Sequence, residues 1–203
     1  MIVFALIFSL LSATLTFGRE LSLKPKLGQT PIKLHVPIHH NDDTLIITSL
    51  RAYIVIPMAS NTVVQLLDLE ENPTCTIPDD AKQITIGIDS LQTVDTDFSH
   101  ALDPIHGMFW TWNSGYINVK IEGISQRSPQ RNHVFQLHLG GYTSPFHTSF
   151  SLNIPQKQSM FLSIDLAECI HEALSKYQGI VMSPGKQAHN LMNILERSIT
   201  LEE

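Results

Sequence analysis

The chain carries two residue types in a pattern that could bind a transition metal. It has 10 His against 13 Lys plus Arg, and its two tryptophans, Trp110 and Trp112, lie two positions apart in the stretch DPIHGMFWTWNSGY. Neutral imidazole nitrogens bind copper, zinc and nickel, and imidazoles from separate strands can converge on one ion. The candidate imidazole ligands are His138, His106 and His39.

The placement of these residues leaves two readings open. His138 lies in HVFQLHLGG, two residues before a glycine pair, and by strand alternation it shares a face with Val134 and Gln136. His106 directly precedes the tryptophan cluster. The indoles either pack at the end of a sheet, where each buries a large apolar area, or include a reactive group beside the histidines. Alternation does not separate these readings.

Signatures of catalysis are absent from the sequence. It contains no G-x-S-x-G elbow, no phosphate-binding glycine loop and no H-E-x-x-H pair. The acidic residues in turn-like stretches are expected to be solvated: Asp42, Asp43, Asp79, Asp80, Asp95 and Asp97. We therefore expect a binding protein and not an enzyme.

Short β-type runs between turn signals must position these side chains. Their spacing, without helices between them, predicts an antiparallel β-sandwich or barrel. The expected strands are IKLHVPI, TLIITSLRAYIVI, TVVQLLDL, QITIGID, YINVKIEG, HVFQLHLGG, FHTSFSLNI and MFLSIDL. Within YINVKIEG, alternation predicts that Ile117, Val119 and Ile121 face the core. It predicts that the other face, which is exposed to water, carries Tyr116, Asn118, Lys120 and Glu122.

Helical periodicity appears at the end of the chain. AECIHEAL predicts one short helix. SPGKQAHNLMNILER predicts a second, with Ser183 as N-cap and Pro184 at the first helical position. Its apolar stripe should pack on one end of the sheets: Ala188, Leu191, Met192 and Leu195.

The N-terminal sequence predicts export, and the net charge argues against a nucleic-acid partner. MIVFALIFSLLSATLTFG, residues 1–18, reads as a secretory signal peptide and leaves residues 19–203 as one domain; a buried first strand is the alternative. No other stretch is long and apolar enough to cross a bilayer. The net charge of −6 provides no basic footprint for nucleic acid. Cys75 and Cys169 could form a disulfide in an oxidising compartment or remain separate core thiols, and the sequence leaves both open.

Several blocks in order resemble the MbnP-like family, the exported copper-binding proteins associated with methanobactin operons. These blocks are GIDS, ALDP, GMFWTWNSGY, KIEG and HLGG, and RAYIV and LLDLEENPTCTIP resemble two further family segments. The similarity runs from about Pro31 to Leu195. RAYIV departs from the family's RYYIS, and the first strand region is shorter than the family's usual opening.

The resemblance implies a periplasmic or secreted β-sandwich, immunoglobulin- or jelly-roll-like, that holds or hands over one copper ion per chain. It implies that His138 and one of Trp110 and Trp112 belong to the site. In some family members a di-haem partner protein oxidises a tryptophan to kynurenine, whose amine and ketone can serve as ligands. The alternative is a non-metal β-sandwich that acts as a surface recognition module.

Overall fold

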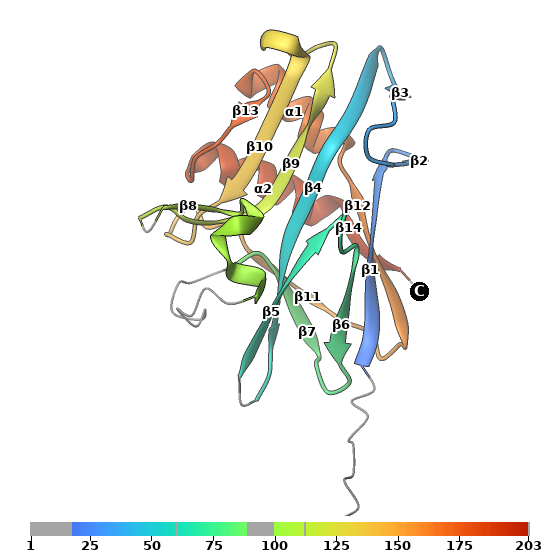
Figure 1. Ribbon diagram of the computed structural model, residues 1–203, viewed down its shortest axis with the longest axis vertical. Coiled ribbons are helices and arrows are strands. Elements are labelled where there is room, and N and C mark those ends of the chain that lie inside the picture. Colours follow the sequence, from blue (N-terminus) through green and yellow to red (C-terminus); the bar gives the residue numbers. More distant parts are fainter. Residues whose placement is uncertain (1–17, 60, 89–99, 112, 203) are drawn as a thin grey trace, which may run out of the picture.

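The protein, described here as a computed structural model, has two β-sheets that share one buried core with the helices α1 and α2 (Figure 1). The model describes residues 18–59, 61–88, 100–111 and 113–202. The expected signal peptide, except Gly18, and Trp112 lie outside these residues. The fold is mainly β and sandwich-like, as the sequence predicts.

The first sheet joins the two ends of the chain. Its strand order is β14-β12-β1-β2, and β6 pairs with β1 as well. The strands are β1 (Gly18–Leu27), β2 (Thr30–Pro31), β6 (Thr74–Pro78), β12 (Ser159–Asp165) and β14 (Ile199–Glu202). The β1–β12 pair is parallel, whereas the other pairs of this sheet are antiparallel.

The second sheet carries the histidine and tryptophan blocks. Its order is β11-β7-β4-β9-β10-β13, with β3 and β5 on β4 and β8 on β9. The strands are β3 (Ile38–His40), β4 (Asp43–Pro57), β5 (Thr62–Asp68), β7 (Gln83–Ile86), β8 (Phe109–Thr111), β9 (Gly115–Ser125), β10 (Val134–Gly140), β11 (Phe150–Asn153) and β13 (Ile180–Val181). The short 3-10 helices are η1 (His100–Leu102), η2 (Pro104–His106) and η3 (Arg131–His133).

The start of the domain differs from the sequence prediction. The expected strand over residues 32–38 is wrong, because β3 begins only at Ile38. Pro37 lacks a backbone N–H, and His35 has a φ of 62°, so this stretch cannot form a regular ladder. The sequence reading instead missed β1, whose alternating Leu21, Leu23 and Leu27 are all buried.

A β-bulge in β9 divides its side chains between two faces. Leu139 of β10 pairs with Val119, but the next residue, Gly140, pairs with Ile117, so Asn118 is the extra residue. Beyond the bulge the alternation is inverted. Val119 therefore faces the main core as predicted, whereas Ile117 packs in a second cluster on the opposite face, and its predicted side is wrong.

Helices α1 (Ala167–Tyr177) and α2 (Lys186–Ser198) pack against the main core. The predicted stripe of α2 is buried: Ala188, Leu191, Met192 and Leu195. The predicted N-cap is wrong, because Gly185 occupies that position and no side chain caps the helix. Pro184 instead packs against Gly141, where an added Cβ would lie 3.0 Å from the Pro184 Cβ.

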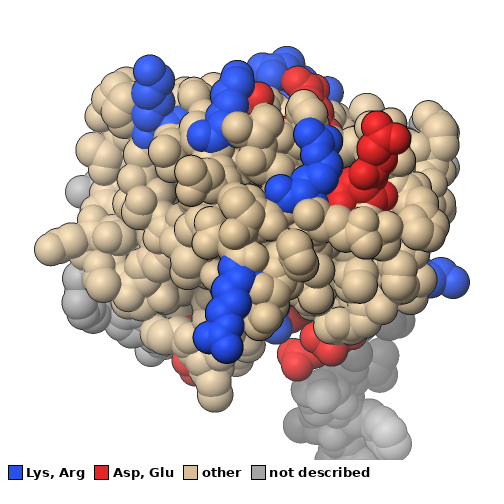
Figure 2. Space-filling model, turned by 90° about the horizontal axis from the view of Figure 1, so that it is seen from above, with Lys and Arg blue, Asp and Glu red and all other residues tan. Residues whose placement is uncertain are grey.

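Cys75 and Cys169 are free, buried thiols of β6 and α1. No helix of the described residues is long and apolar enough to span a membrane. On the face shown in Figure 2, the Lys, Arg, Asp and Glu side chains are interspersed among uncharged residues.

Candidate functional site

An imidazole–carboxylate pair lies on the outer face of β9 and β10. His138 is directly opposite Lys120 across the ladder, and Glu122 is two pairs further along, on the same face of the sheet. Nε2 of His138 lies 2.7 Å from Oε1 of Glu122. This hydrogen bond, together with the charge of Lys120, lowers the pKa of Glu122 to about 2, although partial burial opposes the shift. The ionised carboxylate can only accept, so His138 donates from Nε2, and in the neutral imidazole the lone pair is then on Nδ1.

Two cations border this pair, and each is matched by a carboxylate. Nζ of Lys120 lies 3.6 Å from Oε1 of Glu122. On β4, Arg51 is opposite Lys120, and its Nε lies 2.6 Å from Oδ2 of Asp68. The guanidinium also donates from Nη1 to the carbonyl oxygen of His106, at 2.7 Å. Arg51 thereby ties η2 to the outer face of the sheet.

The indole of Trp110 packs on the next outward position of β10. A Cβ added to Gly140 would lie 2.8 Å from Cζ3 of Trp110, so the ring rests on the glycine backbone. His138 and Gly140 share one face of the strand, about 7 Å apart by strand geometry. Nε1 of Trp110 is buried and has no hydrogen-bond acceptor among the described residues. The structure thus brings Trp110 and His138 into one neighbourhood.

Two tyrosines, Tyr53 of β4 and Tyr116 of β9, hold the η1 segment in place. The rings of Tyr53 and Tyr116 meet edge to face, with centroids 5.7 Å apart. The Tyr53 hydroxyl donates to the carbonyl of Ala101 at 3.0 Å, and the Tyr116 hydroxyl donates to that of Leu102 at 3.3 Å. Burial raises the pKa of both phenols, so both remain neutral donors. They fix η1 against the sheet.

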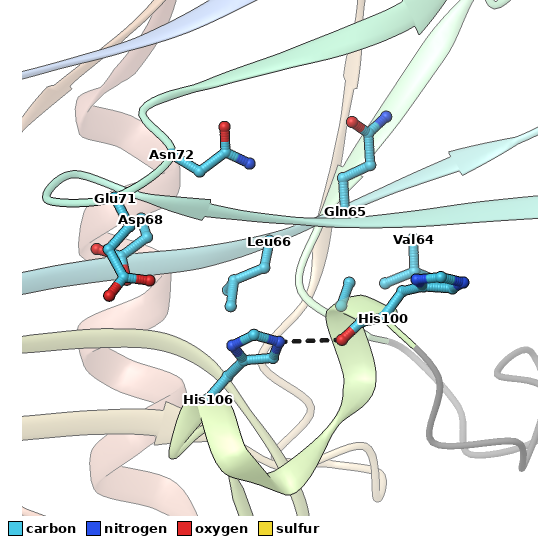
Figure 3. A pocket seen from close by; sticks show the side chains of 9 residues that line it. Val64, Gln65, Leu66, Asp68, Glu71, Asn72, His100 and His106 are labelled. Atoms are coloured by element: carbon cyan, nitrogen blue, oxygen red, sulfur yellow. Dashed lines mark hydrogen bonds between the residues drawn. The ribbon is translucent and has the colours of Figure 1, made fainter.

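His106 lines a cavity of about 300 Å³ (Figure 3). The cavity lies between β5 and the η1–η2 segment, and its lining includes Asp68, Glu71 and His100. Nε2 of His106 lies 3.0 Å from the carbonyl oxygen of His100. Because that oxygen only accepts, Nε2 is the donor of this hydrogen bond.

Comparison with known proteins identifies the family. A family model described as MbnP matches residues 17–183. The chain belongs to the MbnP family. Among solved structures, MbnP from Methylosinus trichosporium is similar with a TM-score of 0.51 and 12% sequence identity, covering 76% of this chain and 77% of that chain. At that identity the likeness concerns the fold. No curated protein matches the chain.

The MbnP blocks converge on one part of the second sheet. GMFWTWNSGY runs from the end of η2 through β8 into β9, and HLGG ends β10. Their contact point is the packing of Trp110 on Gly140. Residues from two separated blocks of this chain therefore meet at Gly140, two residues from His138.

Not every predicted ligand lies there. His39 is an exposed residue of the β3–β4 hairpin, with Nδ1 3.0 Å from Oγ1 of Thr44. Thr44, which pairs with His39, is seven residues from Arg51 on β4, and Arg51 lies in the same cross-strand row as His138. His39 is therefore roughly 20 Å from that row. In Figure 1, β3 and β8 are well separated. Trp112 lies outside the described residues. Within the described ranges, no group of three or more His, Cys, Asp or Glu side chains is arranged to hold a metal ion.

The sequence reading missed the amide that holds the site together. Asn118, the bulge residue, is 1% exposed. Its Oδ1 accepts from the Ile88 amide at 3.0 Å, and its Nδ2 lies 3.1 Å from the carbonyl oxygen and 3.0 Å from Oγ1 of Thr148. Asn118 thus joins the end of β7 and the loop after β10 to β9. The predicted exposure of Asn118 and of Tyr116 to water is wrong, because both side chains are buried. Alternation gave no signal for this, since Asn118 falls among the polar positions of the strand and the bulge changes its surroundings.

Proposed function

We propose that this MbnP-family protein binds copper through His138 beside Trp110, and that it holds or transfers the ion without turning over a substrate. The observation that carries the proposal is the His138–Glu122 hydrogen bond next to the Trp110 indole. Copper is the cargo in this proposal, at one ion per chain.

The chemistry of the pair supports a ligand role for His138. Metal-binding histidines characteristically donate their second ring N–H to a carboxylate, which fixes the tautomer and makes the other nitrogen a better donor. Glu122 occupies that position here, since it holds Nε2 and leaves Nδ1 as the ligating atom. Imidazole is a suitable donor for copper.

A modified Trp110 is the second part of the proposal. Its Nε1 is already buried without an acceptor among the described residues. Oxidation of the indole to kynurenine by a di-haem partner protein would replace a non-ligating ring with an amine and a ketone. Intact-mass measurement on the exported protein tests this step: kynurenine formation removes one carbon atom and adds one oxygen atom, and an unmodified mass in cells that also produce the partner would refute it.

Export to the periplasm or to the outside of the cell belongs to the same proposal. Its support is the apolar N-terminal sequence together with family membership. N-terminal sequencing of the protein from cell fractions tests it. A cytoplasmic chain that retains residues 1–18 would contradict it.

Copper titration of the full domain tests the central claim. We expect His138→Ala to weaken binding at least tenfold and Glu122→Gln to weaken it by about tenfold, the size of effect seen for supporting carboxylates. His39→Ala is the matched control, because that exposed imidazole lies far along β4 and should leave affinity unchanged. Equal affinity of the wild type and His138→Ala would remove His138 from the site.

A non-metal recognition module remains the second candidate, and one observation favours it. The described residues contain no ready set of three metal-ligating side chains. On this reading, the cavity beside His106 would be the contact surface. Wild-type protein, with and without the partner-dependent modification, would then retain no copper after desalting.

A further inference from the structure

The cavity between β5 and the η1–η2 segment has no place in the copper proposal (Figure 3). Its volume of about 300 Å³ is at the lower end of the range for small-molecule sites, about 300–1,000 Å³. Part of its lining is apolar and consists of Val64, Leu66 and Ala101, and the rest is polar. This combination is typical of a ligand site, because apolar groups supply contact area and a few polar groups fix the orientation.

Both walls of the cavity are fixed by hydrogen bonds. On the β5 side, the backbones of Asp68 and Asn72 exchange two hydrogen bonds of 2.9 Å, which close the turn that carries Glu71. On the other side, the guanidinium of Arg51 donates to the carbonyl oxygen of His106 at 2.7 Å. The cavity therefore exists before a ligand binds, so a ligand does not have to order its walls.

Two polar side chains of the lining are already committed to partners in the protein. The side-chain amide of Gln65 donates to the carbonyl oxygen of Thr76 and accepts from its backbone N–H. Oδ1 of Asp68 accepts from the backbone N–H of Glu70, and Oδ2 forms the ion pair with Arg51. The Asp68 charge is therefore neutralised within the protein, and the Gln65 amide is held against β6.

Glu71 is the acid of the lining that remains unmatched. Its side chain is exposed, and no cation among the described residues forms an ion pair with it. In Figure 3 the acidic side chains lie at one end of the cavity and His100 at the other, with the His106 ring between them. Nε2 of His106 donates to the carbonyl oxygen of His100, so in the neutral ring Nδ1 is an acceptor. The cavity thus offers a negative charge, an acceptor nitrogen and an apolar wall.

We propose that this cavity binds an ammonium group carried on a short aliphatic chain. The ammonium donates to the Glu71 carboxylate and to Nδ1 of His106, and the chain packs on the apolar wall. An anionic ligand does not fit, because Glu71 repels it and the lining contains no Lys or Arg. A metal ion does not fit either, since the described residues contain no group of three ligating side chains. Free small amines and the lysine side chains of other proteins both carry the required group.

The experiment is a titration of the full domain with n-butylamine in metal-free buffer, followed through the NMR signals of the histidine C–H groups. We expect a saturable shift of the His106 signals at pH 7, where the amine is charged. Glu71→Gln should weaken binding about fivefold, the upper end for an ion pair that solvent reaches. Glu70→Gln is the matched control, because this neighbouring acid does not line the cavity, and it should equal the wild type.

Two further comparisons separate charge from shape. Butan-1-ol has the same chain without the charge and should bind about fivefold more weakly than n-butylamine. Ala101→Leu should abolish binding, because the added atoms fill the cavity next to the apolar wall. Equal affinity of the wild type and Glu71→Gln, or equal affinity for the alcohol and the amine, would overturn the proposal. So would the absence of a saturable shift at His106.

The source of the ammonium group is tested with Nα-acetyl-lysine N-methylamide, which carries the same four-carbon chain. Binding at least as tight as that of n-butylamine would assign the cavity to a lysine side chain of another protein, whereas weaker binding would assign it to a free amine. No copper is present in these titrations, so their outcome is independent of the copper proposal. Because Glu71 is exposed, its replacement tests the site without disturbing the fold.

Discussion

Replacement of Asn118 by leucine tests whether the bulge amide holds the site segments together. The amide oxygen serves one backbone N–H, and its amino group serves acceptors on Ile88 and Thr148. Two amino hydrogens and one oxygen allow three good hydrogen bonds, each contributing about 1 kcal/mol net. Leucine has a similar volume but satisfies none of them, so we expect a loss of about 3 kcal/mol in the free energy of unfolding.

Urea unfolding measures this loss, and the slope of the free energy of unfolding against urea concentration should be the same in both proteins. For a domain of this size the loss corresponds to a fall of roughly 6–12 °C in Tm. Asn153→Leu, at an exposed position of β11, is the control and should stay within about 0.5 kcal/mol of the wild type. Thr148→Val, which removes part of the network, should cost about 1 kcal/mol. A change below about 0.5 kcal/mol in Asn118→Leu would refute the reasoning.

Three further perturbations report on the same neighbourhood and on the core. The stability that Glu122 contributes is fully present above its ordinary pKa of 4.5 and is lost as the pH falls toward its folded pKa of about 2. The difference in urea midpoint between the wild type and Glu122→Gln should therefore shrink from pH 6 to pH 3. A Cβ added at Gly140 would lie 2.3 Å from the carbonyl oxygen of Tyr116 and 2.8 Å from Cζ3 of Trp110, so Gly140→Ala should cost about 1–3 kcal/mol through both contacts. Tryptophan fluorescence reports on the ring alone, and an unchanged spectrum would contradict its packing on Gly140. Burial raises the pKa of Cys75 to about 12 and also raises that of Cys169, so neither thiol should react with a thiol reagent at pH 8 until the protein unfolds, and rapid labelling of the native chain would contradict their burial.

Sequence periodicity was informative where local pattern and tertiary packing agree. The stripe of α2 and the core position of Val119 follow directly from their spacing, because one buried face imposes one period. The resemblance blocks also identified the neighbourhood of His138 and Trp110, because these blocks carry the contact between β8 and β10.

Structural features that break the period of a strand, or that depend on distant segments, could not be predicted from local sequence pattern. A single bulge at Asn118 inverts the facing of Ile117, and no local rule specifies where a strand inserts an extra residue. His39 was grouped with His138 by residue type alone, although the register of β3 on β4 places it at the far end of the sheet. The sequence predicts a solvated acid at Asp43, yet its side chain is buried, and local pattern does not reveal burial that depends on segments distant in the sequence.

The parallel pairing of β1 with β12 constrains the order of folding. Glu20 has Ser159 as its ladder partner, so the first strand of the domain waits for residues from the last quarter of the chain. Closing so long a loop costs entropy before any contact is gained, and such topologies fold slowly. A nascent chain that ends before residue 159 therefore leaves one edge of β1 unpaired and open to a chaperone that binds extended strands.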